Sequence, residues 1–195
     1  MFIWRFFVGS WWGRVIGFFC LIILVPIIFV VVMSLLLITG GPGPCTAGDG
    51  AINGSPANAA SFNTKWDALD AALGGASPAS DNFNESEITS RAQEFVDATG
   101  APFKNVKICI HDGFGEGTAE LSVLGIGVKV KIKGNVVLSG ASPQAHIDEI
   151  EAGNVPGFIT SFVTRAVEDV LADIDLHRKY TLTLTEGNAK IDGQP

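Results

Sequence analysis

The chain has 195 residues, 47% of them hydrophobic, and a formal net charge of −7 at pH 7. All 20 acidic residues and 11 of the 13 basic residues follow residue 38, so this larger part of the chain has a formal charge of −9. Such acidity argues against nucleic acid as a partner and against strong attraction to anionic lipid.

The first predicted element is an uninterrupted apolar run from Val15 to Ile38, 24 residues without a charge. As a helix it would extend about 36 Å, enough to cross a bilayer core of about 30 Å. It is longer than the apolar core of a signal peptide, no A-x-A cleavage site follows it, and the residues before Cys45 do not suit a lipoprotein. We therefore predict a cytoplasmic segment at residues 1–14 and a transmembrane helix at 15–38.

The charges that flank this run predict its orientation. Arg5 and Arg14 precede the run, and no Lys or Arg follows it until Lys65. Basic residues next to a membrane span favour the cytoplasmic side. The predicted localisation is the cell membrane, with a single span, a cytoplasmic N-terminus and the C-terminal part outside the cell.

The next stretch has a low-complexity composition. Residues 39–61 are rich in Gly, Ala, Pro, Ser and Asn and offer little apolar surface to bury, so we predict a flexible linker. A short amphipathic helix follows at residues 62–74, and its apolar face is made of Phe62, Trp66, Leu69 and Leu73. Residues 74–82 are predicted to form a second flexible joint.

The folded domain is predicted at residues 83–192. Asn84 and Glu87 have the spacing of a capping box at a helix start. Alternation of apolar and polar side chains then predicts antiparallel strands around residues 106–111, 117–133, 136–138 and 145–150. A long helix begins near Pro156, a residue favoured in a first helical turn, and a hairpin at 180–192 closes the domain. The predicted fold class is α+β: an N-terminal transmembrane helix, then a curved antiparallel sheet wrapped around a long helix.

The three cysteines do not define a disulfide framework. Cys20 lies in the apolar run, Cys45 in the predicted linker and Cys109 in a predicted strand. Two interpretations stay open: a Cys45–Cys109 disulfide outside the cell, or a small buried Cys109 with an unpaired Cys45.

The order of these motifs resembles the small bacterial lipid-binding proteins related to the tubular lipid-binding (TULIP) superfamily, such as the LmeA-like and YceB-like families. The similarity covers residues 83–192 and rests on four loose motifs: the entry segment Phe83–Ser90, strands around 106–111 and 117–133, the helix start Val155-Pro156-Gly157-Phe158, and the closing hairpin around Thr185-Glu186-Gly187-Asn188. The resemblance implies a TULIP-like half module that binds membrane lipid in an apolar groove. It implies no catalytic residue.

An apolar helix face opposite an apolar sheet face fits either a packed core or a lipid-binding groove. The residues expected to line such a groove are Phe158, Phe162, Val163, Val167, Leu171, Leu121, Val128, Val130 and Leu138. The leading functional prediction is therefore a membrane-anchored extracytoplasmic domain that binds a lipid or other apolar ligand between long helix and sheet. The alternative is a ligand-free structural or interaction module of an envelope protein complex.

Motifs of known chemistry do not occur in the sequence. There is no G-x-S-x-G nucleophile elbow and no H-E-x-x-H metal-binding helix, and the glycines at 113, 115 and 117 suit a hairpin better than a dinucleotide site. We predict no enzyme activity, no catalytic residue, no metal and no cofactor. The predicted partners are membrane lipid and an envelope protein, and nucleic acid is excluded.

Overall fold

The computed structural model describes residues 26–28 and 41–194, except for residues 76, 124–125, 139–142, 153–160, 162, 166, 170–175 and 177. Two helices and seven strands have defined bounds in this part of the chain. The order is α3 (Pro56–Gly74), β1 (Ala79–Asn84), α4 (Glu85–Thr99), β2 (Phe103–His111), β3 (Phe114–Val123), β4 (Ile126–Val137), β5 (Gln144–Glu151), β6 (Lys179–Thr185) and β7 (Asn188–Gln194).

The strands form two antiparallel sheets, where the sequence analysis predicted one curved sheet wrapped around a long helix. Strands β2, β3, β4 and β5 pair in chain order, whereas β6 and β7 form a second sheet with β1 in the order β1-β7-β6. The predicted fold class is therefore wrong in its sheet arrangement. The physical reason is β1, a strand that the sequence analysis missed: it pairs with β7 along six residues and gives the closing hairpin a sheet of its own.

The transmembrane helix of the predicted fold class is not among the described helices. In the described part of the chain, no helix is long and apolar enough to cross a membrane. The run at 15–38 lies outside the described residues, apart from the helical residues 26–28. Most of the predicted long helix also lies outside them, and only residues 161, 163–165 and 167–169 are described there as helical.

The helix α3 begins at Pro56, six residues before its predicted start. The Ser55 side chain accepts a hydrogen bond from the Asn58 N–H and so caps the helix, and Pro56 occupies the first turn. The predicted linker at 39–61 therefore contains the first turn of a helix. Helix α4 has the predicted capping box, because Asn84 and Glu87 exchange hydrogen bonds between side chain and backbone N–H.

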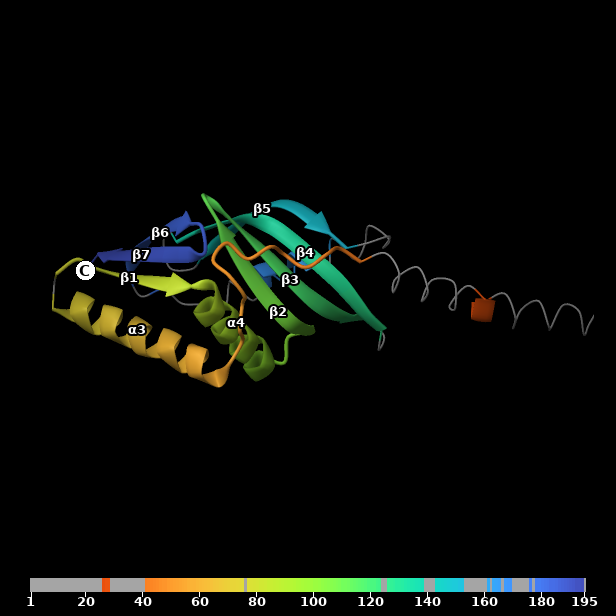
Figure 1. The fold of residues 1–195 in the computed structure, drawn as a ribbon, viewed down its shortest axis with the longest axis horizontal. Helices are drawn as coiled ribbons and strands as arrows, with labels where there is room; N and C mark the ends of the chain where they lie inside the picture. Colours follow the sequence, from red (N-terminus) through yellow and green to blue (C-terminus); the bar gives the residue numbers. More distant parts are fainter. Residues whose placement is uncertain are drawn as a thin grey trace, which may run out of the picture. The chain divides into compact units, whose positions relative to one another are not determined.

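The core next to the three-stranded sheet is rich in aromatic rings. Phe83 on β1 is fully buried, and its ring centroid lies 4.6 Å from that of Phe62 on α3. Trp66, one turn further along α3, lies 5.3 Å from Tyr180 on β6. Leu69 and Leu73 complete the buried face of α3. Figure 1 shows α3 lying along this sheet.

The strand β4 continues through a predicted turn. The predicted strands at 117–133 and 136–138 leave a turn at Gly134 and Asn135, but β4 runs on to Val137 and pairs with β5 from Lys131 to Val137. The pairing register shifts between Lys133 and Gly134, which marks a bulge. A Cβ atom at Gly134 would collide with the His146 carbonyl oxygen, so this glycine permits close approach of two strands.

Candidate functional site

The segment before α3 is the most unusual part of the fold. Residues 41–55, which we call the strap, have no regular secondary structure and cross the four-stranded sheet before they reach α3 (Figure 1). A disulfide joins Cys45 of the strap to Cys109 on β2, with the two Cα atoms 6.0 Å apart. Cys109 is fully buried. Of the two interpretations left open by the sequence, the structure therefore shows the bonded one.

Side chains of α4 bind the backbone of the strap. The Gly48 N–H donates to Glu85 Oε1 at 2.9 Å, the Asn53 N–H to Ser86 Oγ at 3.0 Å, and the Ser55 N–H to Ser90 Oγ at 3.0 Å. These bonds compensate for the low apolar content of the strap, because they give its backbone donors partners inside the domain. Composition alone predicted a flexible linker here, since the acceptors lie more than 30 residues away in sequence.

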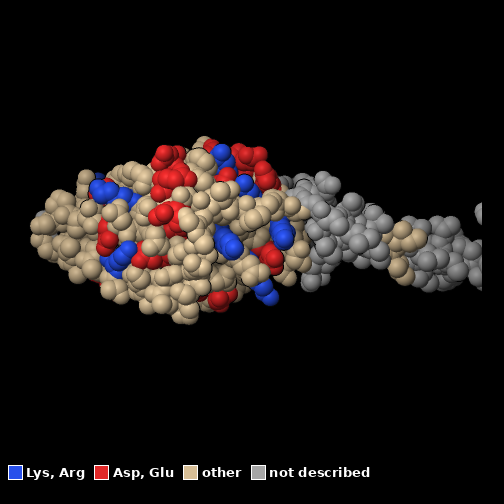
Figure 2. Space-filling view, viewed as in Figure 1, with Lys and Arg blue, Asp and Glu red and all other residues tan. Residues whose placement is uncertain are grey.

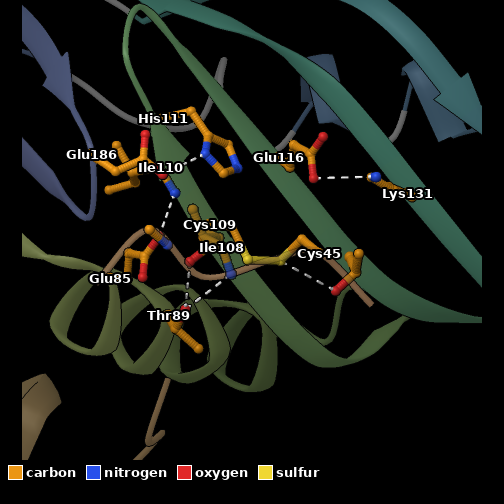
Figure 3. Close-up of a disulfide and its surroundings, with 12 residues drawn as sticks. Cys45, Glu85, Thr89, Ile108, Cys109, Ile110, His111, Glu116, Lys131 and Glu186 are labelled. Carbon is orange, nitrogen blue, oxygen red and sulfur yellow. Dashed lines mark hydrogen bonds and ion pairs between the residues drawn. A yellow bond between two sulfur atoms is a disulfide. The ribbon is translucent and has the colours of Figure 1, made fainter. Parts of the chain in front are cut away.

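A neighbouring row of α4 side chains, which also includes Glu85, binds the edge strand β2 in a periodic way. Three side chains spaced four residues apart, Glu85, Thr89 and Gln93, accept the backbone N–H groups of Ile110, Ile108 and Val106 at 2.7, 2.9 and 2.9 Å. Figure 3 shows the first two of these contacts. Four helical residues advance about 6.0 Å and two strand residues about 6.8 Å, so the two repeats nearly match. Helix α4 thus protects this edge of the sheet from pairing with another strand.

Thr89 provides a test of this arrangement. Its hydroxyl accepts the Ile108 N–H and donates to the Ile108 carbonyl, and the residue is 3% exposed. We expect Thr89→Val, which keeps the shape but loses both bonds, to lower the free energy of unfolding by about 1–3 kcal/mol. Urea unfolding measures the change. Thr89→Ser, which keeps the hydroxyl, is the control, and an equal loss in both variants would contradict a role for these hydrogen bonds.

Glu87 is a buried charge in the same helix. It is 4% exposed, and its carboxylate contacts Lys65 Nζ at 2.8 Å, the Ser61 hydroxyl at 2.6 Å and the Asn84 N–H at 3.0 Å. Burial alone would raise the pKa of this carboxyl. The hydrogen bonds from Lys65, Ser61 and Asn84, together with the Lys65 charge, outweigh burial and hold the pKa below its usual 4.5. Glu87 therefore ties α4 to α3 in its ionised form.

This lowered pKa predicts a pH dependence of stability. Because the folded-state pKa of Glu87 lies below the unfolded-state value, its contribution is complete above about pH 4.5 and is lost as the pH falls through the folded-state pKa. The free energy of unfolding is measured at intervals between pH 6 and about pH 3. Below about pH 4.5 it should fall less steeply with pH in Glu87→Gln than in wild type. Glu94→Gln, which changes an exposed carboxyl of the same helix, is the control. Parallel pH profiles for wild type and Glu87→Gln would contradict the assignment.

The turn between β6 and β7 connects the two sheets. Its Gly187 N–H donates to the Ile110 carbonyl at 2.9 Å, and its Glu186 carboxylate contacts His111 Nδ1 at 2.9 Å (Figure 3). Gly187 has a φ of +73°, and a Cβ atom there would collide with Asp49 of the strap. The closing turn is therefore fixed by β2 and by the strap together.

An open groove of about 1040 Å³ lies beside the strap. Its walls come from the strap, the first turns of α3, residues 89–97 of α4 and strands β2 to β4. Apolar groups and charged groups both line it. The apolar lining includes Pro42, Pro44, Ile52, Ala59, Ala60 and Val106, and the charged lining consists of Glu94, Asp97, Glu120, Lys107 and Lys129.

The sequence-predicted lipid-binding residues occupy different places. Leu121, Val128 and Val130 lie on paired positions of β3 and β4 and are at most 2% exposed, and Val163 is fully buried. Val130 also contributes to the groove beside the strap. Leu138 packs half-buried against the aromatic core, and Val167 is half-buried. The remaining three, Phe158, Phe162 and Leu171, lie outside the described residues. The groove beside the strap was not predicted from the sequence, because the composition of residues 39–61 predicts a flexible linker.

Among the residues that the structure describes, no three His, Cys, Asp or Glu side chains gather closely enough to hold a metal ion. His111 instead contacts Glu186 and stacks on Phe114, and the exposed His146 lies 3.6 Å from Asp148. Each of these histidines has an ordinary structural partner.

No protein-family model, curated protein or solved structure matches this chain. The resemblance to TULIP-related lipid-binding proteins therefore stays a prediction.

Proposed function

We propose that residues 41–194 form an extracytoplasmic recognition module without enzymatic activity, which binds a segment of a partner protein in the groove beside the strap. The observation that carries this proposal is the mixed lining of the groove. Glu94 and Asp97 on α4 face the same volume as Lys107 on β2 and Lys129 on β4, between prolines and alkyl groups. A polypeptide combines polar backbone, charged side chains and apolar side chains, and so matches all three kinds of surface.

The same lining disfavours an acyl chain as the occupant. A lipid tail would displace water from carboxylates and ammonium groups without replacing their hydrogen bonds, which is costly for charged groups. Sites for apolar ligands are lined mainly by hydrophobic side chains with few polar groups. The open shape of this groove, with five charged residues in its lining, fits a protein segment better.

The disulfide supports a location outside the cytoplasm. Disulfides persist in oxidising compartments and are rare where thiols are kept reduced. The Cys45–Cys109 bond agrees with the side of the membrane predicted from Arg5 and Arg14. Attachment to the membrane through residues 15–38 remains a prediction, because these residues lie outside the described part of the chain.

Lipid binding is the second candidate, and the sheet interior favours it. Leu121, Val128 and Val130 make an apolar face on β3 and β4, at positions that the sequence analysis assigned to a lipid groove. Native mass spectrometry of the full-length protein released from detergent measures any bound lipid. Phospholipid or fatty acid retained at a fixed ratio would favour this candidate over the recognition module, and an empty protein would count against it.

Site-specific photo-cross-linking tests the recognition module. Ala60 lines the groove, and Ala68 is an exposed alanine two turns further along the same helix that does not. We expect benzoylphenylalanine at position 60 of the full-length protein, irradiated in its native membrane, to form one dominant protein adduct. The same label at position 68 should not form it. Identical adducts at both positions, or a lipid adduct at position 60, would contradict the proposal.

A further inference from the structure

We propose that the occupant of the groove is an extended, cationic polypeptide segment, whose basic side chains pair with Glu94 and Asp97 of α4. This inference rests on the proposed function, since it names the chemistry of the partner at the same groove. Its evidence is the way α4 binds extended chain elsewhere, the placement of its carboxylates in the groove and the charge of the domain.

Helix α4 already binds two extended segments through two neighbouring rows of side chains that share Glu85. Side chains at positions 85, 86 and 90 accept N–H groups of the strap, and those at 85, 89 and 93 accept N–H groups of β2. The helix continues past these contacts, and its Glu94 and Asp97 line the groove. The C-terminal half of α4 thus presents further acceptor side chains where a third extended segment could lie.

These two carboxylates retain acceptor capacity. Glu94 Oε2 contacts Arg91 at 2.9 Å and Asp97 Oδ1 accepts from Gln93 at 2.8 Å. Within the described part of the chain, neither second oxygen has a hydrogen-bond partner. The Arg91–Glu94 pair is largely exposed, so it is worth little and leaves Glu94 free to change partner.

Glu94 and Asp97 lie near the C-terminal end of α4, where a negative charge is unfavourable unless a cation lies beside it. The carbonyl groups at a helix C-terminus concentrate negative potential, which favours Lys, Arg or His there. Helix α4 ends at Thr99, places Asp97 in its last turn, and has no basic residue in that turn. Departures from such local rules concentrate at functional sites. A cationic side chain of a partner would supply the missing counter-charge.

The opposite wall orients the segment. The sheet side carries Lys107 and Lys129, which repel cations, and one carboxylate, Glu120, which already accepts a hydrogen bond from Asn105. Basic side chains of the segment are therefore directed towards α4. Alternate side chains of an extended chain point the same way, about 6.8 Å apart, and side chains three apart on a helix lie about 5–6 Å apart. Glu94 and Asp97 therefore match basic residues at every second position of the segment.

The overall charge favours the same partner. The part of the chain after residue 38 has a formal charge of −9, which attracts cationic segments over distance and increases association rates. On the face shown in Figure 2, acidic and basic side chains are interspersed. Specificity for a cationic segment therefore depends on the local pair Glu94 and Asp97.

A peptide selection on the full-length protein in detergent micelles tests this inference. Random dodecapeptides displayed on phage are selected on wild type and depleted on Gly54→Trp, a variant that fills the groove from the strap, where a side chain at position 54 meets open space. We expect the retained peptides to carry Lys or Arg at alternate positions. A synthetic peptide from this set should bind the double variant Glu94→Gln/Asp97→Asn about tenfold more weakly than wild type, with a smaller difference at high salt.

A matched control separates local pairing from net charge. Asp67→Asn/Glu149→Gln removes two exposed carboxylates outside the groove, and it should change the affinity less than about threefold. Equal losses in the two double variants would overturn the inference. Retained peptides that depend on an open groove but lack basic residues would also overturn it while leaving the recognition module intact. Peptides that bind Gly54→Trp as well as wild type would contradict both.

Discussion

Replacing both bonded cysteines, as Cys45→Ala/Cys109→Ala, is expected to lower the free energy of unfolding by about 4 kcal/mol. The disulfide closes a loop with a sequence separation of 64, and chain-entropy arguments assign a cross-link of this span a stabilisation of about that size. The loop contains most of the strap, α3, β1 and α4, so the unfolded chain regains a large amount of freedom when the bond is absent. The strap should also lose protection against amide hydrogen exchange.

Urea unfolding of the oxidised full-length protein, followed by circular dichroism, measures this loss. Cys20→Ala, which changes the cysteine outside the bond, is the control and should unfold like wild type. Wild type treated with a dithiol reductant under denaturing conditions and then refolded in reductant should match the double variant. Equal midpoints for oxidised wild type and the double variant would show that the disulfide adds nothing to stability.

Phe83→Ala is expected to cost about 3–5 kcal/mol, the range for truncation of a buried aromatic residue. Phe83 is 0% exposed and is the largest fully buried side chain in the described part of the chain. Its ring packs against Phe62 and Trp66 of α3, and its backbone pairs with Ala189 of β7. The truncation would therefore leave a cavity between the helix and the three-stranded sheet.

The same unfolding experiment tests this prediction. Phe83→Leu retains most of the volume and should cost less than half as much as Phe83→Ala. Val137→Ala, at an exposed position on β4, should have little effect. A loss below about 1 kcal/mol for Phe83→Ala would mean that this residue is not a centre of the core, contrary to its burial.

Local sequence rules identified those elements whose partners are close in sequence. The capping box at Asn84 and Glu87 was correctly predicted because both hydrogen bonds join residues three apart. The turn at Glu186-Gly187 and the alternation along β2, β3 and β5 were visible for the same reason. These features depend on spacing and side-chain type, which a single sequence displays.

Elements that depend on distant partners were missed. Strand β1 has one buried apolar side chain, Phe83, and owes its structure to pairing with β7 more than 100 residues later. The strap has a linker composition, yet Glu85, Ser86 and Ser90 hold its backbone. The alternation that predicted strands could not show which strands pair, and so could not distinguish one sheet from two.

The groove beside the strap could not be predicted from the sequence for a related reason. A groove whose walls include the strap cannot be predicted while the strap is taken as a flexible linker. The apolar positions Leu121, Val128 and Val130 were correctly identified as inward-facing, since period-two alternation marks a buried face. Pattern alone does not reveal whether such a face meets side chains or a ligand.

The disulfide between the strap and β2 also determines how the domain would bear mechanical load. Tension applied to the chain ahead of Cys45 enters β2 at Cys109 through a covalent bond. The loop between the two cysteines, which holds α3, β1 and α4, is shielded from that tension. Force would then act on the pairing of the edge strand β2 with β3, while α4, which forms part of the groove wall, carries no load. An oxidised molecule pulled from its N-terminal side should therefore lengthen less before rupture than a reduced one.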